Sequence, residues 1–206
     1  MAPENAAPAL TPKGLATKAR IVEQAAELMY TRGVHATSND LVRRHAGVSG
    51  SQLAHYFPDK QSLVDAVIAW RAEQILRIHH DEKFSRFESI GALRQWADFY
   101  IAYERACQEG CTLGSLANEV IKGELHDRDQ LKELFEQWRR ILFEGLERMR
   151  DRGRLRPDAD PAQLANSLMA ALQGGMLLAQ LEHDMTPLRD ALTAAVDHVE
   201  SFTVDA

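Results

Sequence analysis

Two short helical segments joined by a glycine turn constrain this 206-residue chain more than any other feature. Thr37 is placed to cap a first short helix, which Gly47 would end. Ser49–Gln52 has the Ser-x-x-Gln spacing of a capping box, so a second helix should begin there. Pro58 disfavours helical geometry at the residue before it and would end that second helix. The pattern predicts a helix-turn-helix with its turn at Gly47.

The rest of the chain has the periodicity of amphipathic helices, and no segment alternates apolar and polar residues as a half-buried strand does. We therefore predict an all-α protein of about nine helices. Residues 1–14 lack a helical period and are expected to form a disordered N-terminal arm. A three-helix domain is predicted at 15–60 and a larger helical domain at 61–206. Their remaining helices are expected at 17–32, 59–80, 90–108, 128–151, 160–184 and 187–202, with a short one after Cys111.

Charge is distributed unevenly along the chain, whose formal net charge is −6. Residues 1–60 contain seven Lys/Arg and five Asp/Glu, a net charge of +2, whereas the remaining residues carry −8. Binding to nucleic acid depends on local rather than total charge. The negative net charge of the chain is therefore compatible with a basic, nucleic-acid-binding N-terminal segment followed by an acidic remainder.

Several short motifs at fixed spacing within residues 17–68 resemble the TetR family of helix-turn-helix transcriptional regulators. The matching positions are Ala25-Ala26-Glu27-Leu28, Gly33, Thr37-Ser38, Leu41-Val42, Ala46-Gly47-Val48-Ser49, Leu53, Tyr56-Phe57-Pro58-Asp59-Lys60 and Leu63. The chain departs from the family pattern at Gly50-Ser51, where Lys-Gly is usual, and at Ala54, where Tyr is usual. The resemblance implies an N-terminal DNA-binding domain, and the departures imply an unusual operator sequence.

A recognition helix reads base edges in the major groove with its N-terminal residues. Gln52 is suited to a bidentate bond with adenine, although it could instead only complete the capping box with Ser49. Lys60 stands at a helix N-terminus, where free N–H groups and the helix dipole favour a phosphate. The full set of predicted DNA-contacting residues is Thr37, Arg43, Arg44, Ser49, Gly50, Ser51, Gln52, His55, Tyr56 and Lys60.

A single short recognition helix reads few bases, so helix-turn-helix proteins commonly bind palindromes as dimers. Two adjacent glycines inside a helix cost stability unless close packing requires them. Such packing could join two copies of the chain, as the resemblance implies, or could lie within one copy. The predicted homodimer interface is Leu168, Leu172, Gly174, Gly175, Leu188, Leu192, Ala195 and Val199.

Aromatic residues recur at helical spacing on one face of the segment 90–108. Such a stripe could be ordinary core, or it could line the apolar effector cavity that the resemblance implies for the larger domain. Tyr and Trp suit a ligand site because they combine apolar area with a polar group. The predicted contacts to a small, largely apolar effector are Trp96, Phe99, Tyr100, Tyr103 and Trp138.

The only two cysteines, Cys107 and Cys111, are too few for a disulfide framework and are typical of a cytoplasmic protein. The segment around Cys111 resembles one in a TetR subgroup, some of whose members sense electrophiles through cysteine. A thiol near a helix N-terminus can be reactive, which makes Cys107 and Cys111 possible redox residues. Alternatively, Cys111 is a small buried hydrophobic residue.

Other classes of protein are disfavoured. With 45% hydrophobic residues the chain is not disordered, and its longest apolar run is too short to span a bilayer. We find no phosphate-binding loop, dinucleotide motif or nucleophile elbow, and predict no enzyme activity, cofactor or metal. The sequence thus predicts a cytoplasmic repressor that binds operator DNA as a homodimer and is released by a small effector. The alternatives are a cysteine-based electrophile sensor and a helical interaction module without specific DNA binding.

Overall fold

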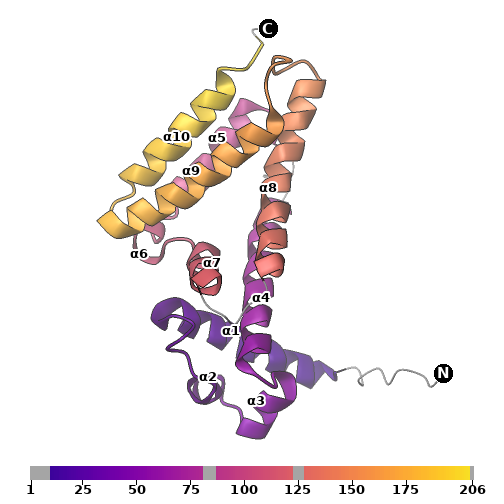
Figure 1. Cartoon of the computed structure of the whole chain (residues 1–206), viewed down its shortest axis with the longest axis vertical. Coiled ribbons are helices and arrows are strands. Elements are labelled where there is room, and N and C mark those ends of the chain that lie inside the picture. The colour runs from indigo at the N-terminus through magenta and orange to yellow at the C-terminus, as the bar shows by residue number, and fades with distance from the viewer. Residues whose placement is uncertain (1–9, 81–86, 123–127, 205–206) are drawn as a thin grey trace, which may run out of the picture. The chain divides into compact units, whose positions relative to one another are not determined.

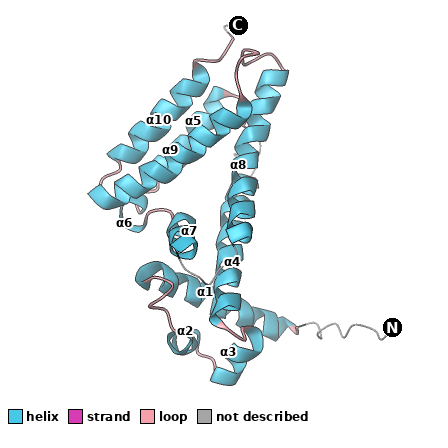
Figure 2. Ribbon diagram, in the orientation of Figure 1, coloured by secondary structure: helices cyan, strands magenta, loops and turns pink. Residues whose placement is uncertain are grey.

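The computed structural model describes residues 10–80, 87–122 and 128–204. The described residues are helical apart from loops and one isolated β-bridge between Leu155 and Thr203 (Figure 2). The all-α fold is confirmed. The chain divides into two compact units between Trp70 and Arg71, within α4 (Lys60–His80), whereas we predicted a boundary at residue 60. Of the predicted N-terminal arm, residues 1–9 lie outside the described residues.

The first unit contains a long helix followed by the two short helices of the predicted motif (Figure 1). α1 begins earlier than the predicted residue 17, because Thr11 caps it by accepting a hydrogen bond from the Gly14 N–H at 3.2 Å. Pro12 fits the first turn, where its missing N–H is not needed. The elements of this unit are α1 (Pro12–Arg32), α2 (Asn39–Ala46), α3 (Gly50–Tyr56) and the first part of α4.

The turn between α2 and α3 has the predicted geometry. Gly47 ends α2 with φ +62°, a left-handed conformation that glycine adopts without strain. The Ser49 hydroxyl accepts from the Gln52 N–H at 3.1 Å, and the Gln52 Oε1 accepts from the Ser49 N–H at 2.9 Å. The capping box at the start of α3 is therefore confirmed.

The predicted cap of α2 is wrong by one residue. Ser38, not Thr37, accepts the hydrogen bond from the Leu41 N–H, at 3.2 Å. Thr37 is only 1% exposed, and its hydroxyl donates to the Gly33 carbonyl at 2.9 Å. The side chain of Thr37 thus stabilises the preceding turn and does not reach the surface where a phosphate would bind.

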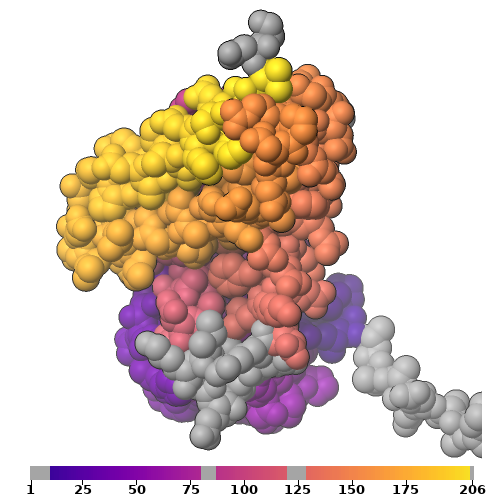
Figure 3. Space-filling view, turned by 45° about the horizontal axis from the view of Figure 1, so that its top comes forward, coloured from indigo at the N-terminus to yellow at the C-terminus, as the bar shows by residue number. Residues whose placement is uncertain are grey.

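The second unit is a bundle of long helices around an apolar core. α9 packs against both α8 and α10, and these neighbours stand out as adjacent ribbons and as adjoining orange and yellow surfaces (Figures 1 and 3). α9 alone among the described helices is long and apolar enough to cross a membrane by composition, and 44% of that apolar window is buried in the protein. The elements are α5 (Ile90–Ile101), α6 (Ala106–Glu109), α7 (Thr112–Lys122), α8 (Arg128–Asp151), α9 (Pro161–Glu182) and α10 (Thr186–Glu200).

The single helix predicted at 90–108 is wrong. The chain turns after Ile101 and re-forms as the short α6, although no proline or glycine marks the break. Packing accounts for the turn, because α5 lies against α10 while α6 lies against α9. The helical stripe of aromatic residues is therefore interrupted between Tyr100 and Tyr103.

Candidate functional site

The exposed face of α3 consists of the small and polar residues predicted to face DNA. Gly50, Ser51, Gln52 and His55 are exposed, whereas Leu53 on the opposite face is buried. The Ser49 and Ser51 hydroxyl oxygens are 3.0 Å apart at the start of the helix. This face could therefore be presented to a groove without uncovering the core of the first unit.

The capping box restricts how Gln52 could read a base. A bidentate bond to adenine uses the amide oxygen as acceptor and the amide nitrogen as donor. The Gln52 Oε1 is already bonded to the Ser49 N–H. A bidentate contact would thus require Oε1 to accept a second hydrogen bond through its other lone pair, while a single hydrogen bond donated by Nε2 would leave the cap unchanged.

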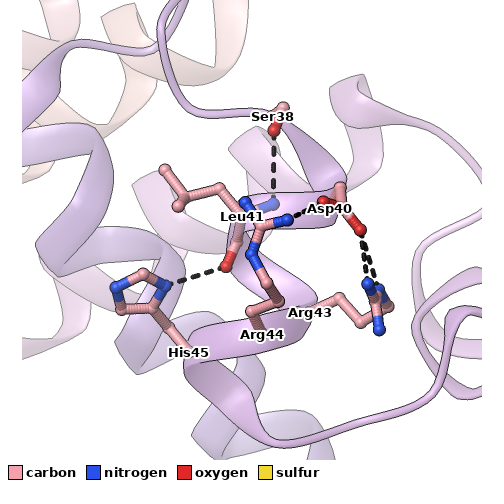
Figure 4. A network of polar contacts seen from close by, with 6 residues as sticks. All are labelled: Ser38, Asp40, Leu41, Arg43, Arg44 and His45. Carbon is pink, nitrogen blue, oxygen red and sulfur yellow. Dashed lines mark hydrogen bonds and ion pairs between the residues drawn. The ribbon is translucent and has the colours of Figure 1, made fainter.

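Arg43 and Arg44 are both paired with one carboxylate on α2 (Figure 4). The Asp40 Oδ1 accepts from the Arg43 Nε at 3.0 Å and from its Nη2 at 2.5 Å, and the Asp40 Oδ2 accepts from Arg44. The hydrogen bond from Arg43 holds the pKa of Asp40 below its usual value. Arg43 also flanks α3, since its Cδ would lie 4.0 Å from a side-chain carbon added at Gly50.

Sequence reasoning missed the pairing of Asp40 with the two arginines. Asp40 stands three and four residues before Arg43 and Arg44, which is the spacing of side chains that meet on a helix surface. That spacing was the available signal. Because of Asp40, the positive charge that the two arginines offer to a phosphate is partly neutralised.

Lys60 and Tyr56 flank the other end of the motif. Lys60 begins α4, and its Nζ donates to the His35 carbonyl at 3.3 Å. Asp59 accepts from the Ser62 N–H at 2.7 Å, and this bond lowers the pKa of the Asp59 carboxyl. Tyr56 is half-buried, and its hydroxyl lies beside Gly14 at the start of α1. Lys60 is held next to the α2–α3 motif within the same unit.

In the second unit, three of the five aromatic residues predicted to contact an effector are buried in the core. Trp96, Trp138 and Tyr100 are buried around His79 of α4. Phe99 and Tyr103 are exposed, and the Tyr103 hydroxyl donates to Glu109 at 3.0 Å. The break after Ile101 turns Tyr103 away from the buried stripe, and the effector contacts of these five residues stay a prediction.

Three donors converge on one nitrogen of the buried His79. The Nε1–H groups of Trp96 and Trp138 each lie 3.2 Å from the His79 Nε2, and the Tyr100 hydroxyl lies 3.3 Å from it. An indole N–H can only donate, so Nε2 accepts and the proton of the neutral ring is on Nδ1. The Nδ1–H then donates to the Ile75 carbonyl at 2.8 Å. Burial also holds the pKa of the Tyr100 phenol well above its usual value.

A cavity of about 350 Å³ lies elsewhere in this unit, between α7, α8 and α9. None of the five aromatic residues predicted to bind an effector lines it. Among the described residues, no lysine, arginine, aspartate or glutamate lines it either. Its walls are Cys111, Gly114, Ser115, Ala117, Asn118, Phe135, Gln173, Gly174, Leu177 and Gln180.

Cys111 caps α7 but is not activated there. Its Sγ accepts from the Gly114 N–H at 3.2 Å. Burial nevertheless raises the pKa of the thiol, and contacts with Gly114 and Gln173 offset only part of this rise. The thiol of Cys107, on the neighbouring α6, donates a hydrogen bond to the Glu104 carbonyl at 2.9 Å. A thiol is less nucleophilic than a thiolate, so this geometry argues against Cys111 as a readily oxidised residue.

Most side chains predicted to join two copies of the chain pack within one copy. α9 and α10 lie against each other, and a side-chain carbon added at Gly175 would come within 2.9 Å of the Leu188 Cα. Gly174 is exposed and Ala195 is half-buried, so these two remain predictions. The prediction is wrong for the six fully buried positions Leu168, Leu172, Gly175, Leu188, Leu192 and Val199.

A different face of α9 is apolar and exposed. Leu177, Leu178 and Leu181 are 59%, 46% and 74% exposed, and Ala170 and Gly174 continue the same helical face toward the N-terminus of α9. We call these five residues the α9 stripe. Sequence reasoning missed its leucines, because helical periodicity alone does not distinguish one apolar face of α9 from the other.

Comparisons with known proteins agree with this architecture. Residues 21–67 match the family described as "Bacterial regulatory proteins, tetR family", and residues 89–195 match "Tetracyclin repressor-like, C-terminal domain". The chain is 24% identical over 182 residues to the HTH-type transcriptional repressor DhaR of Mycobacterium sp. strain GP1, covering 86% of this chain and 89% of DhaR. It is 28% identical over 181 residues to an HTH-type transcriptional regulator of Lactococcus lactis, covering 84% and 87% of the two chains.

Among solved structures, a TetR transcriptional regulator from Chloroflexus aurantiacus superposes with a TM-score of 0.80 at 21% identity, covering 95% of this chain and 100% of that one. This likeness concerns the fold. The C-terminal match alone covers more than half of the chain, and the N-terminal match contains the capped α2–α3 motif. The chain therefore belongs to the TetR family of DNA-binding, helix-turn-helix transcriptional regulators.

Proposed function

We propose that this regulator is a cytoplasmic repressor that binds a palindromic operator as a homodimer and is released by a small, largely apolar effector. The observation that carries the DNA-binding part is the exposed face of α3, which presents Gly50, Ser51, Gln52 and His55 from a capped helix. The name of the relative DhaR supports the role of repressor. The exposed α9 stripe supports the homodimer, since a second copy would cover its leucines.

In this proposal the protein makes few contacts to the bases of the operator. Gln52 donates one hydrogen bond through Nε2 to an acceptor in the major groove and keeps Oε1 in the capping box. Gly50 and Ser51 allow a close approach but provide little discrimination between bases. We therefore expect affinity to depend on phosphate contacts and on the pairing of two motifs.

Selection of bound sequences from random double-stranded DNA tests the proposal. The expected result is an enriched inverted repeat whose half-sites are about one helical turn apart or a multiple of it. An enriched single half-site would contradict the dimeric reading. The absence of any enrichment, with a folded protein, would favour the alternative of a helical interaction module.

Replacing Lys60 with alanine should weaken binding to every DNA sequence alike. Lys60 stands at the N-terminus of α4, where it would contact a phosphate rather than a base. Losing one phosphate contact should reduce the slope of log affinity against log salt by about one unit. Gel shifts at several salt concentrations measure this slope. Lys132→Ala on α8 is the control, and an unchanged slope for Lys60→Ala would refute the assignment.

Replacing Asp40 with asparagine should have the opposite effect. Asp40 is paired with Arg43 and Arg44, so its neutralisation frees both cations for phosphate. We expect affinity at low salt to rise by about three- to tenfold and the salt slope to steepen. Asp98→Asn, at an exposed position of α5, removes the same charge elsewhere and should change neither. Weaker binding by Asp40→Asn would mean that the pairs position the arginines instead.

A further inference from the structure

We propose that the cavity between α7, α8 and α9 binds a small uncharged molecule through a hydrogen-bond acceptor such as a ketone, lactone or amide carbonyl. The inference rests on the proposed function, because it names the class of effector. The site differs from the aromatic cluster at His79, where we first expected the ligand.

The size and walls of the cavity suit a small organic molecule. Its volume of about 350 Å³ is within the range of 300–1,000 Å³ usual for ligand pockets. Ala117, Phe135 and Leu177 provide apolar contact area. Gly174 and Leu177 are exposed on α9 within one copy, so the cavity opens there, and a second copy on the α9 stripe would cover this opening in the proposed homodimer.

The Gln173 amide is the group that specifies an acceptor. Its Nε2 is buried, and the polar atom that it approaches is the Cys111 sulfur, which is only a weak acceptor. A buried donor with so weak a partner costs free energy, which an oxygen acceptor on a ligand would recover. The amide can occupy this place because residue 114 is glycine, since a side-chain carbon there would be 2.7 Å from the Gln173 Oε1.

The polar groups of the cavity disfavour ions of either sign. Ser115, Asn118 and Gln180 are uncharged, and the lining residues that the structure describes include no charged side chain to compensate an ion. Burial raises the pKa of Cys111, so its thiol adds no negative charge near neutral pH. A carboxylate or an ammonium group would lose its hydration without gaining a partner.

Three probes that share a naphthalene skeleton test the proposal. The full-length protein is titrated calorimetrically with 2-acetylnaphthalene, with 2-ethylnaphthalene and with 2-naphthoate. We expect the ketone to bind about tenfold more tightly than the hydrocarbon, which offers the Gln173 donor no oxygen acceptor. The carboxylate should bind at least tenfold more weakly than the ketone.

Substitution at Gln173 locates the hydrogen bond. Gln173→Leu should reduce the affinity for the ketone about tenfold and leave that for the hydrocarbon unchanged. Gln163→Leu makes the same change at an exposed position of α9 and is the control. Equal ketone affinity in Gln173→Leu and the wild type would overturn the assignment, as would a failure of the ketone to bind the wild type.

A measurement on the wild type remains decisive if Gln173→Leu does not fold. Iodoacetamide alkylates a cysteine by forming an S–C bond, with iodide leaving and the thiol proton passing to the buffer. The alkylation of Cys111 is followed by mass spectrometry. The ketone should slow it at least fivefold relative to 2-naphthoate at equal concentration, and no slowing would refute the site.

A protein that binds operator DNA but not the ketone refutes this inference alone. Ketone binding without DNA binding would refute the proposed function instead.

Discussion

Replacing His79 with leucine is expected to lower the free energy of unfolding by about 3–6 kcal/mol. His79 Nε2 is the acceptor toward which Trp96, Trp138 and Tyr100 all direct a donor. Leucine is of similar size but accepts no hydrogen bond, so these buried donors would be left unpaired together. An unpaired buried donor costs about 1–3 kcal/mol, and the low polarity of the core increases that cost.

Urea denaturation followed by circular dichroism measures this loss, with Tyr100→Phe as the matched control. That variant removes the donor at 3.3 Å and keeps the ring. Because a single nitrogen lone pair cannot satisfy three donors equally, removing one donor should cost less than about 1 kcal/mol. His79→Gln restores an acceptor and should recover part of the stability. Equal losses for His79→Leu and Tyr100→Phe would show that the convergence at Nε2 contributes little.

Placing aspartate in the α9 stripe is expected to disrupt the homodimer and, with it, tight operator binding. Leu178→Asp and Leu181→Asp, made separately, each put a charge on the exposed apolar face that a second copy would cover. Burying an unpaired charge at an interface costs about 2–4 kcal/mol, which raises the dimer dissociation constant by roughly 30- to 1,000-fold. Affinity for a palindromic operator should fall accordingly, toward that of one motif on one half-site.

Analytical ultracentrifugation measures the dimer and gel shifts measure operator binding. Gln137→Asp adds the same charge at an exposed position of α8 and should leave both unchanged. Both α9 variants should keep the helical circular-dichroism spectrum of the wild type, because the two leucines are exposed within one copy. Dimers that persist in both variants would show that another surface joins the two copies.

Short sequence motifs predicted most of the local structure of the first unit. The Ser49 capping box and the Gly47 turn form as expected, because a cap or a left-handed turn involves residues only two or three positions apart. The cap of α2 was assigned one residue early, since Thr37 and Ser38 can both cap a helix and only burial distinguishes them. The pairing of Asp40 with two arginines was also within reach of the sequence, through helical spacing.

For the second unit, the sequence predicted buried residues but not which of them contact one another. Trp96, Tyr100 and Trp138 are apolar residues at helical spacing, and periodicity predicts only that they face inward. That they surround His79 depends on α4, α5 and α8 meeting at that residue. Gly175 likewise indicated a close contact, but only the structure identified Leu188 of the same chain as its partner.

The sequence by itself determined the all-α class, the capped helix-turn-helix and the family, because these depend on spacings within a few turns of helix. The tertiary structure alone decided which apolar faces are covered. It buries one side of α9 against α10, exposes Leu177, Leu178 and Leu181, and leaves a cavity that Gln173 lines. The physical reason is that helix periodicity defines a face, whereas its occupant depends on side chains brought together from distant parts of the chain.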